Sequence, residues 1–309
     1  MAKTPARILV VSAEQSGRRL DNFLSSVLKT LPKSFIYRII RRGEVRVNGG
    51  RARPHRKLLA DDKVRVPPIT ETDSADLLIS RSVADEIARA IIFENDSLIV
   101  VNKPSGFAVH AGSGLRYGVI DVIRQLRPDI PDVELVHRID RETSGCLVIA
   151  KDYPSLRMSQ KQLNDPTSCK TYRALLHGRL PSPTMEVNLK LNTVQLNGEK
   201  RSVVDENGKR ANTEFSLLDY VAGMSYVEAK ITTGRTHQIR AHAAAIEHAI
   251  VGDKKYTDNH LNIETKTLGL NRMFLHALSV DISLNERAKP VTILAPLAPQ
   301  LERFLNNLR

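Results

Sequence analysis

Near the N-terminus, apolar residues recur at the spacing of two amphipathic helices. The first helix is predicted over 20–28, where apolar side chains fall at positions i, i+3, i+4, i+7 and i+8. The second follows a break at Pro32, with Ser34 as a candidate N-cap and Gly43 just past its end. The two apolar faces consist of Leu20, Phe23, Leu24, Val27 and Leu28, and of Phe35, Ile36, Ile39 and Ile40.

Two alternating stretches, 44–47 and 63–66, follow the helices and predict short strands. An Asn-Gly-Gly turn at 48–50 ends the first strand, and a Pro-Pro pair ends the second. The next residues, 69–90, are acidic and contain Ser and Thr, which is typical of a linker.

From residue 91 onward the pattern changes to apolar runs that are typical of buried strands. These runs lie at 91–94, 98–101, 134–136, 146–150 and 170–176. A Thr-Gly-Arg turn at 233–235 leads into a helix that includes Ile239. We therefore divide the chain into an N-terminal extension, a first domain, a linker and a second domain, at 1–16, 17–68, 69–90 and 91–309.

The composition is that of a folded protein with no membrane span. A chain of 309 residues with 41% hydrophobic residues exceeds the usual size of one domain and can bury a core. It has no uncharged apolar run of about 18 residues, and its first residues lack the apolar stretch of a signal peptide. Cys146 and Cys169 form neither a zinc spacing nor a disulfide framework. These features predict a cytoplasmic protein.

The positive charge is concentrated in the first domain. The formal net charge is +12, and residues 17–66 contain 14 Lys and Arg against 4 Asp and Glu. Arg38, Arg41 and Arg42 lie on one face of the second predicted helix, and Arg46 lies in the strand that follows. A segment of one sign favours binding to a nucleic acid or to an anionic membrane surface. A solvated surface without a ligand is the alternative, although such a surface usually mixes both signs.

The segment H-R-I-D-R-E-T-S-G at 137–145 is the main candidate for chemistry. It interrupts two apolar runs, so it is predicted to form a loop at the edge of a sheet. Asp140 lies between Arg138 and Arg141, whose positive charges favour the carboxylate form. An ionised Asp140 is suited to act as a nucleophile or a base. A structural ion pair that holds the loop is the alternative, and local charge does not decide between the two.

Two further polar segments are N-K-P-S-G-F-A-V-H at 102–110 and T-G-R-T-H-Q-I-R-A-H at 233–242. His237 and His242 are five positions apart, which is not the spacing of a helical metal pair, and no P-loop occurs. We therefore expect neither a metal nor a cofactor. Taken alone, Tyr172 is an ordinary strand residue.

The first domain closely resembles the S4-type RNA-binding domain over residues 17–68, on its two helices and on V-R-V-N-G at 45–49. This resemblance implies recognition of structured RNA by its shape and its phosphates.

The second domain resembles the RluA-type pseudouridine synthases. The segments at 102–110, 137–145 and 233–242, followed by Leu275-His276-Ala277, match four motifs of that family in order. The chain departs from the family pattern at Ile139, which is usually Leu, and at Thr257, which is often Gly. The resemblance implies an α+β fold: a small S4-type αα-β domain, then a catalytic domain with a mixed, largely antiparallel β-sheet, flanking helices and a central active-site cleft.

The resemblance also implies roles by position. Asp140 corresponds to the catalytic aspartate, Tyr172 to a tyrosine that stacks on the target uracil, and Arg240 to the residue that pairs with the carboxylate. Arg138 corresponds to the arginine that fills the gap left by the flipped nucleotide. The other candidates for RNA contact are His137, Arg141, Arg235, His237, Arg38, Arg41, Arg42 and Arg46.

The implied reaction is the isomerisation of uridine to pseudouridine, which changes no redox state and needs no cofactor or metal. Within the family the chain looks most like enzymes of large-subunit ribosomal RNA, which implies 23S rRNA as the partner. No spare apolar helix face is evident, so we expect a monomer. The residues leave open whether Asp140 attacks C6 of the base, attacks C1′ of the sugar or removes a ribose proton.

Two other functions compete with this interpretation. A non-enzymatic S4-domain RNA-binding ribosome-assembly factor would use the same basic surface, but it needs none of Asp140, Tyr172 and Arg240. An Asp-dependent nucleoside or glycoside hydrolase usually needs two carboxylates about 5–10 Å apart. For that role Glu142 is the only candidate nearby in the sequence.

Overall fold

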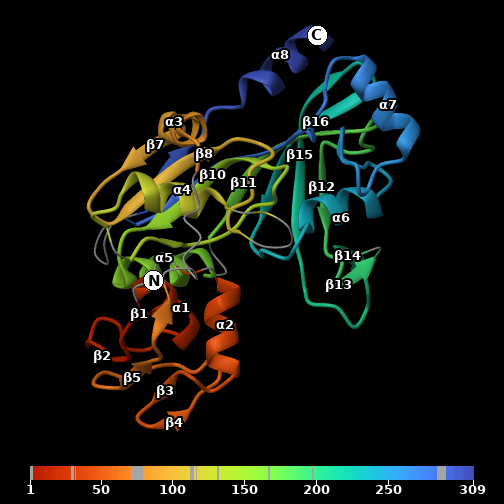
Figure 1. Ribbon diagram of the computed structural model, residues 1–309. Helices are drawn as coiled ribbons and strands as arrows, with labels where there is room; N and C mark the ends of the chain where they lie inside the picture. Colours follow the sequence, from red (N-terminus) through yellow and green to blue (C-terminus); the bar gives the residue numbers. More distant parts are fainter. Residues whose placement is uncertain are drawn as a thin grey trace.

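The computed structural model describes residues 3–28, 31, 33–70, 79–111, 115, 117–130, 132–165, 168–196, 198–283 and 290–309. The chain forms a small N-terminal part and a larger part that contains a 10-stranded sheet (Figure 1). Within the described ranges, no helix is long and apolar enough to cross a membrane.

The small part packs two helices on a four-stranded antiparallel sheet. Helices α1 (Leu20–Val27) and α2 (Lys33–Arg41) bury the predicted apolar faces, and their core side chains are at most 2% exposed: Leu20, Phe23, Leu24, Ile36, Ile39 and Ile40. The sheet contains, in spatial order, β2 (Arg7–Val10), β5 (Lys63–Val66), β3 (Arg46–Val47) and β4 (Gly50–Arg51). The predicted strand at 63–66 is confirmed.

The first residues of the chain also belong to this part. Strand β2 comes from the residues assigned to the extension and pairs with β5, although Ile8 and Val10 stay exposed. Strand β1 (Lys3–Thr4) pairs with β6 (Ile69–Thr70). The exposed apolar residues of β2 carry no alternating pattern, which is why the sequence did not predict a strand there.

The large sheet is built from β7 (Ile91–Glu94), β8 (Leu98–Lys103), β9 (Glu134–Leu135), β10 (Ser144–Ala150), β11 (Lys170–Leu176), β12 (Thr184–Val187), β15 (Thr213–Val221), β16 (Met224–Ile231), β17 (Leu275–Ile282) and β18 (Val291–Leu294). Its main path is β12–β15–β16–β11–β17–β10–β8–β7, with β18 beside β17 and β9 beside β10. A separate hairpin contains β13 (Leu191–Leu196) and β14 (Glu199–Val204). The predicted strands at 91–94 and 170–176 are confirmed with the same limits.

Strands β10 and β17 pair in parallel, whereas the other described pairs of the sheet are antiparallel. This seam depends on Gly145, which has a φ of +111°. A Cβ atom there would lie 2.1 Å from the carbonyl oxygen of Ala277. The glycine of the T-S-G sequence therefore lets the two strands meet directly behind the Asp140 loop.

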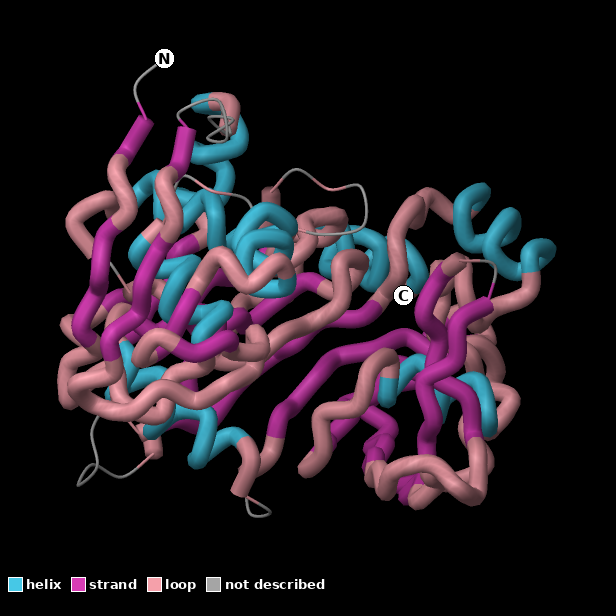
Figure 2. Tube along the Cα trace, turned by 60° about the horizontal axis from the view of Figure 1, so that its bottom comes forward, coloured by secondary structure: helices cyan, strands magenta, loops and turns pink. Residues whose placement is uncertain are grey.

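The helices of the large part are α3 (Arg81–Arg89), α4 (Val119–Leu126), α5 (Tyr153–Leu163), α6 (Gln238–Ala245), α7 (Asn259–Thr267) and α8 (Pro299–Leu308). Helix α5 packs on β9, β10 and β17, and α6 packs beside β14 and β15. Figure 2 shows the helices lying against the strands. The fully buried strand β10 lies at the centre of the main hydrophobic core. The predicted α+β fold with a largely antiparallel sheet is confirmed.

Arg18 joins the two parts of the molecule. Its side chain is 1% exposed, donates to Asp132 Oδ1 at 2.7 Å and lies 3.5 Å from Glu134. Its guanidinium carbon lies 5.4 Å from the centre of the Tyr153 ring, at the start of α5. A buried cation is stable only with such partners. Arg18 therefore fixes the small part against α5.

We expect Arg18→Gln to lower the free energy of unfolding by about 1–3 kcal/mol, because Asp132 and Glu134 lose a desolvated partner but stay partly hydrated. Urea or thermal unfolding measures the change. Arg42→Gln is the matched control, since Arg42 is exposed and 3.9 Å from Glu44. The control should change the stability by less than about 0.5 kcal/mol. Equal losses in the two variants would contradict an interface held by Arg18.

Candidate active site

Asp140 lies on the loop between β9 and β10, and a second loop supports it. Lys103, at the end of β8, is fully buried. Its Nζ donates to three backbone carbonyl oxygens, those of Pro104, Phe107 and Arg141. The last of these belongs to the residue directly after Asp140. Burial lowers the pKa of Lys103 to about 7. The segments 102–110 and 137–145 therefore form one structural unit in which the buried Lys103 side chain holds the loop.

Arg240, in the first turn of α6, connects two carboxylates. Its Nη1 donates to Asp140 Oδ2 at 3.0 Å. Its Nε and Nη2 make a bidentate pair with Asp253, at 2.7 and 2.8 Å. Arg240 and Asp253 are 4% and 1% exposed. Burial alone would lower the pKa of Arg240, but the hydrogen bonds and charges of Asp253 and Asp140 outweigh it and raise that pKa. The ion pair predicted between Asp140 and Arg240 is therefore present, with Asp253 as the bidentate partner.

The two arginines next to Asp140 in the sequence do not pair with it. Arg141 Nε donates to the Gly106 carbonyl at 2.8 Å and lies 3.8 Å from Glu142. Arg138 is exposed and lines the cleft. Among the ion pairs of the described residues, neither arginine reaches Asp140. The expectation that its sequence neighbours compensate this carboxylate is therefore corrected: Arg240 does so, 100 residues further along the chain.

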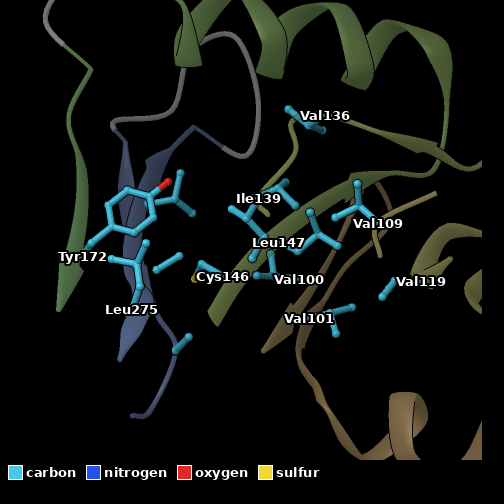
Figure 3. Close-up of a cluster of buried hydrophobic side chains, with 14 of the residues drawn as sticks. Val100, Val101, Val109, Val119, Val136, Ile139, Cys146, Leu147, Tyr172 and Leu275 are labelled. Carbon is cyan, nitrogen blue, oxygen red and sulfur yellow. The ribbon is translucent and has the colours of Figure 1, made fainter. Parts of the chain in front are cut away.

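Tyr172 lies on β11 at the wall of the cleft. Its ring is buried beside Leu275 at the edge of the hydrophobic core (Figure 3). Burial, followed by the charge of Asp140, raises the pKa of Tyr172, so its hydroxyl stays protonated at neutral pH. Because the hydroxyl is uncharged, the ring gives the cavity an apolar surface on which a nucleic-acid base can stack.

His237 precedes α6 in a left-handed conformation with a φ of 50°, which is uncommon for a residue other than glycine. Its Nε2 lies 3.8 Å from Asp140 Oδ2, and its Nδ1 lies 3.1 Å from the Tyr256 hydroxyl. That hydroxyl also bonds to the backbone of Ser202 on β14. Burial, only partly opposed by Asp140, lowers the pKa of His237, so its ring is neutral at pH 7. The positive charge that faces Asp140 therefore comes from Arg240.

Two cavities meet at Asp140. One cavity has a volume of about 360 Å³ and is lined by Tyr172. The other has a volume of about 560 Å³ and is lined by Arg272. Asp140, Arg138, His237 and Arg240 line both. Both volumes lie within the range of about 300–1,000 Å³ that is typical of small-molecule sites. A ligand that occupied both cavities would therefore pass directly beside the Asp140 carboxylate.

Comparison with known proteins identifies the family. The pattern of the RNA pseudouridylate synthase family matches residues 97–245, and that of the S4 domain matches residues 18–64. The ribosomal large subunit pseudouridine synthase C of Pasteurella multocida (strain Pm70) is 44% identical over 306 residues, which cover 98% of this chain and 94% of that protein. The chain belongs to the RNA pseudouridylate synthase family.

Other members of the family extend this result. The ribosomal large subunit pseudouridine synthase C of Escherichia coli (strain K12) is 40% identical over 99% of this chain and 98% of its own. Among solved structures, Human RNA Pseudouridylate Synthase Domain Containing 4 matches with a TM-score of 0.61 and 25% identity, over 74% of this chain and 96% of that one. The protein is therefore an RNA pseudouridine synthase with an N-terminal S4 domain.

The other predicted site residues of this synthase are dispersed. His137 Nε2 accepts from the Val148 N–H at 3.1 Å, and burial lowers its pKa to about 4, so its neutral ring positions the loop. Arg235 is exposed at the rim and donates to the Arg210 carbonyl at 3.1 Å. The arginines of the S4 domain lie outside both cavities: Arg38, Arg41, Arg42 and Arg46.

Sequence reasoning missed several residues of the synthase site. Asp253 and Tyr256 follow the buried pair Ile250-Val251. An acidic residue so close to a buried apolar pair is the signal that could have indicated Asp253. Lys103 lay inside a recognised segment, but its burial was not predicted. Within the described ranges, no group of three His, Cys, Asp or Glu side chains could hold a metal ion.

Proposed function

We propose that this synthase converts one or more uridines of large-subunit 23S ribosomal RNA to pseudouridine. The observation that carries the proposal is the carboxylate of Asp140, held by Arg240 where two cavities meet beside Tyr172. The choice of ribosomal RNA is supported by the similarity, over nearly the whole chain, to proteins named ribosomal large subunit pseudouridine synthase C. Because that RNA is cytoplasmic in bacteria, we infer a cytoplasmic location, and a monomer remains our prediction.

The target uridine has to leave its base stack, because its reacting atoms are otherwise inaccessible. Flipping a base costs a few kcal/mol. In our proposal the uracil enters the smaller cavity and stacks on Tyr172, which contributes about 1–3 kcal/mol. Arg138 is exposed at the rim of both cavities, where it can occupy the place that the base leaves.

The reaction breaks the bond between N1 and C1′, rotates the base and forms a bond between C5 and C1′. C5 loses a proton and N1 gains one, so atoms and charge balance without another reactant. Asp140 is the group at the junction that can act as a nucleophile or a base. The single bond from Arg240 Nη1 leaves Asp140 Oδ1 without a described hydrogen-bond donor, and this oxygen is the one that we assign to the reaction.

The S4 domain provides the second contact with RNA in this proposal. Arg38 and Arg41 are exposed on α2, and Arg42 is exposed directly after it; the Arg38 guanidinium carbon lies 4.6 Å from the centre of the Phe35 ring. Arg46 lies on the neighbouring strand β3. Parallel guanidinium groups suit the phosphates of a structured RNA. We propose 17–68 as the S4-type RNA anchor, preceded by the extension 1–16, and 91–309 as the catalytic domain. The proposed linker 69–90 connects them, although it contributes β6 to the small part and α3 to the large part.

The proposal is tested by incubating the purified protein with unmodified large-subunit rRNA and mapping pseudouridine. We expect pseudouridine at a small number of fixed positions. Binding without pseudouridine would favour the ribosome-assembly factor, and release of free uracil would favour a hydrolase. Pseudouridine in other RNAs but not in 23S rRNA would overturn the proposed choice of substrate and leave the proposed reaction intact.

We expect the double variant Arg41→Gln and Arg42→Gln to weaken rRNA binding and to reduce the slope of log affinity against log salt by about two, since each phosphate contact contributes about one. Filter binding from low to high salt measures the slope. Arg89→Gln with Arg303→Gln is the matched control, because it removes the same charge from exposed positions on α3 and α8. Equal slopes in the two double variants would show that α2 is not the anchor.

A further inference from the structure

Arg272 is a largely buried cation that forms no ion pair with any of the described residues, although the more distant charge of Glu142 acts on it. Its Nε donates to the Met273 carbonyl at 3.2 Å, and its Nη2 donates to Ser144 Oγ at 2.7 Å and to the Leu275 carbonyl at 3.5 Å. All three acceptors are neutral. Among the described residues, no carboxylate lies within 4 Å of this guanidinium, whereas Arg240 has two. An uncompensated buried charge costs stability unless a counterion arrives from outside.

The free end of Arg272 opens into the larger cavity. Its Nη1 has no hydrogen-bond acceptor among the described residues and is not enclosed by protein. The guanidinium lines the cavity of about 560 Å³ that also contains Asp140. Two N–H groups of Nη1 therefore remain available to a ligand in the same cavity as the catalytic carboxylate.

A buried hydrogen-bond relay fixes the orientation of Arg272. Ser144 Oγ accepts from Arg272 and lies 2.9 Å from Nδ1 of His276, and the other ring nitrogen of His276 lies 3.1 Å from the Ala295 carbonyl. Burial lowers the pKa of His276 to about 4, so its ring is neutral and can donate to Ala295 while it accepts from Ser144. Ser144 and His276 also form the parallel seam between β10 and β17. The arginine is thus held rigidly by the centre of the sheet.

The surroundings of Arg272 favour an anion. Arg138, Arg201 and Lys254 line the same cavity, and no described carboxylate pairs with any of them. The four acids of the cavity each have a cationic partner: Asp140 and Asp253 share Arg240, Glu142 lies 3.8 Å from Arg141, and Glu199 lies 2.5 Å from Lys255. Lys103 lies behind the loop, where burial lowers its pKa to about 7, and its Nζ already donates to three carbonyls. Arg272 is therefore the buried cation that can contact the ligand directly.

We propose that Arg272 binds a backbone phosphate of the RNA directly next to the flipped uridine. A guanidinium with free N–H groups in a fixed orientation matches the geometry of phosphate oxygens. With the uracil beside Tyr172 in the smaller cavity and the phosphate on Arg272 in the larger one, the nucleotide spans Asp140. The phosphate contact then sets the position of the sugar relative to the carboxylate. This inference rests on the proposed function for its choice of target uridine.

The test combines Arg272→Gln with neutral phosphates. Short RNA substrates carry the uridine mapped with the parent protein, and each has one methylphosphonate at a different position around it. With the parent protein, we expect one position to lower both RNA binding and kcat/KM by about 10–100-fold, the range for one charge-assisted hydrogen bond. With Arg272→Gln, the all-phosphate RNA should show a loss of the same size, and the methylphosphonate at that position should add less than about threefold.

Arg309→Gln is the matched control, since Arg309 is paired with Asp219 away from the cleft. In this variant, the methylphosphonate at each position should lower binding and kcat/KM as much as it does in the parent. If thermal unfolding shows that Arg272→Gln is destabilised, Arg272→Lys replaces it. This variant keeps the charge but loses the fork of N–H groups, and a smaller penalty at the same single position is expected.

If the methylphosphonate at each position had the same effect on the parent as on both Arg272 variants, the proposal would be overturned and Arg272 would have a structural role. A parent protein that binds rRNA but makes no pseudouridine would overturn the proposed function. In that case the short RNAs for the binding measurement are centred on the rRNA segment that the protein protects in footprinting, so the phosphate contact is still tested.

Discussion

Asp140→Asn is expected to lower the rate of pseudouridine formation by about 10⁴-fold or more, because an amide is neither a nucleophile nor a base at neutral pH. The substitution changes little else. The amide oxygen has the shape of the oxygen that it replaces and can still accept from Arg240 Nη1. Arg240 also keeps both bonds to Asp253, so no buried cation is left unpaired. RNA binding and the unfolding temperature should therefore stay close to those of the parent.

The measurement is single-turnover conversion on a defined rRNA fragment, with filter binding and thermal unfolding on the same preparations. Asp219→Asn is the matched control, since it changes an exposed carboxylate on β15 that pairs with Arg309. The control should convert uridine at the parental rate. Conversion by Asp140→Asn within tenfold of the parent would remove Asp140 from the chemistry and return it to a structural ion pair.

The elements that were predicted well are those whose buried positions form a regular pattern within one continuous segment of the sequence. Strand β10 buries every position, and strand β11 buries Tyr172 and the three positions 174–176, so an apolar run located both. Helix α1 was located by its 3.6-residue period, which its burial pattern repeats. Strand β2 gave no such signal, because Ile8 and Val10 remain exposed and its pairing partner β5 lies more than 50 residues away.

Contacts between distant segments limit what the sequence can predict about the site. The motif that contains Asp140 was recognised, and the family resemblance placed Arg240 beside it. The flanking arginines were expected to favour the carboxylate form of Asp140, but neither pairs with it, because side chains that are neighbours in an irregular loop can point in different directions. Asp253 was missed because its importance comes only from its contact with Arg240. The relay through Ser144, His276 and Arg272 depends on the parallel pairing of β10 with β17, which no local pattern indicates.

Arg240→Gln is expected to lower activity by about 100-fold and to destabilise the fold together. The variant leaves the carboxylate of Asp253 buried, with the Lys255 N–H at 2.9 Å as its remaining described donor. Removing one partner of a buried ion pair costs about 3–5 kcal/mol. Asp140 loses its cationic partner as well, so its orientation is no longer fixed, and a misplacement of about 1 Å costs about 100-fold in rate. Urea unfolding and single-turnover conversion measure the two effects on one sample.

The double variant Arg240→Gln with Asp253→Asn separates the two effects. Replacing the buried carboxylate by an amide removes the uncompensated charge, so most of the lost stability should return. Asp140 stays without its guanidinium partner, so activity should stay as low as in Arg240→Gln. Asp253→Asn alone should lose less activity than Arg240→Gln, because Arg240 Nη1 can still reach Asp140. If the double variant regained activity in proportion to its stability, Arg240 would act only by holding α6 in place. If stability returned and activity did not, the bond from Nη1 to Asp140 would be the part of the network on which catalysis depends.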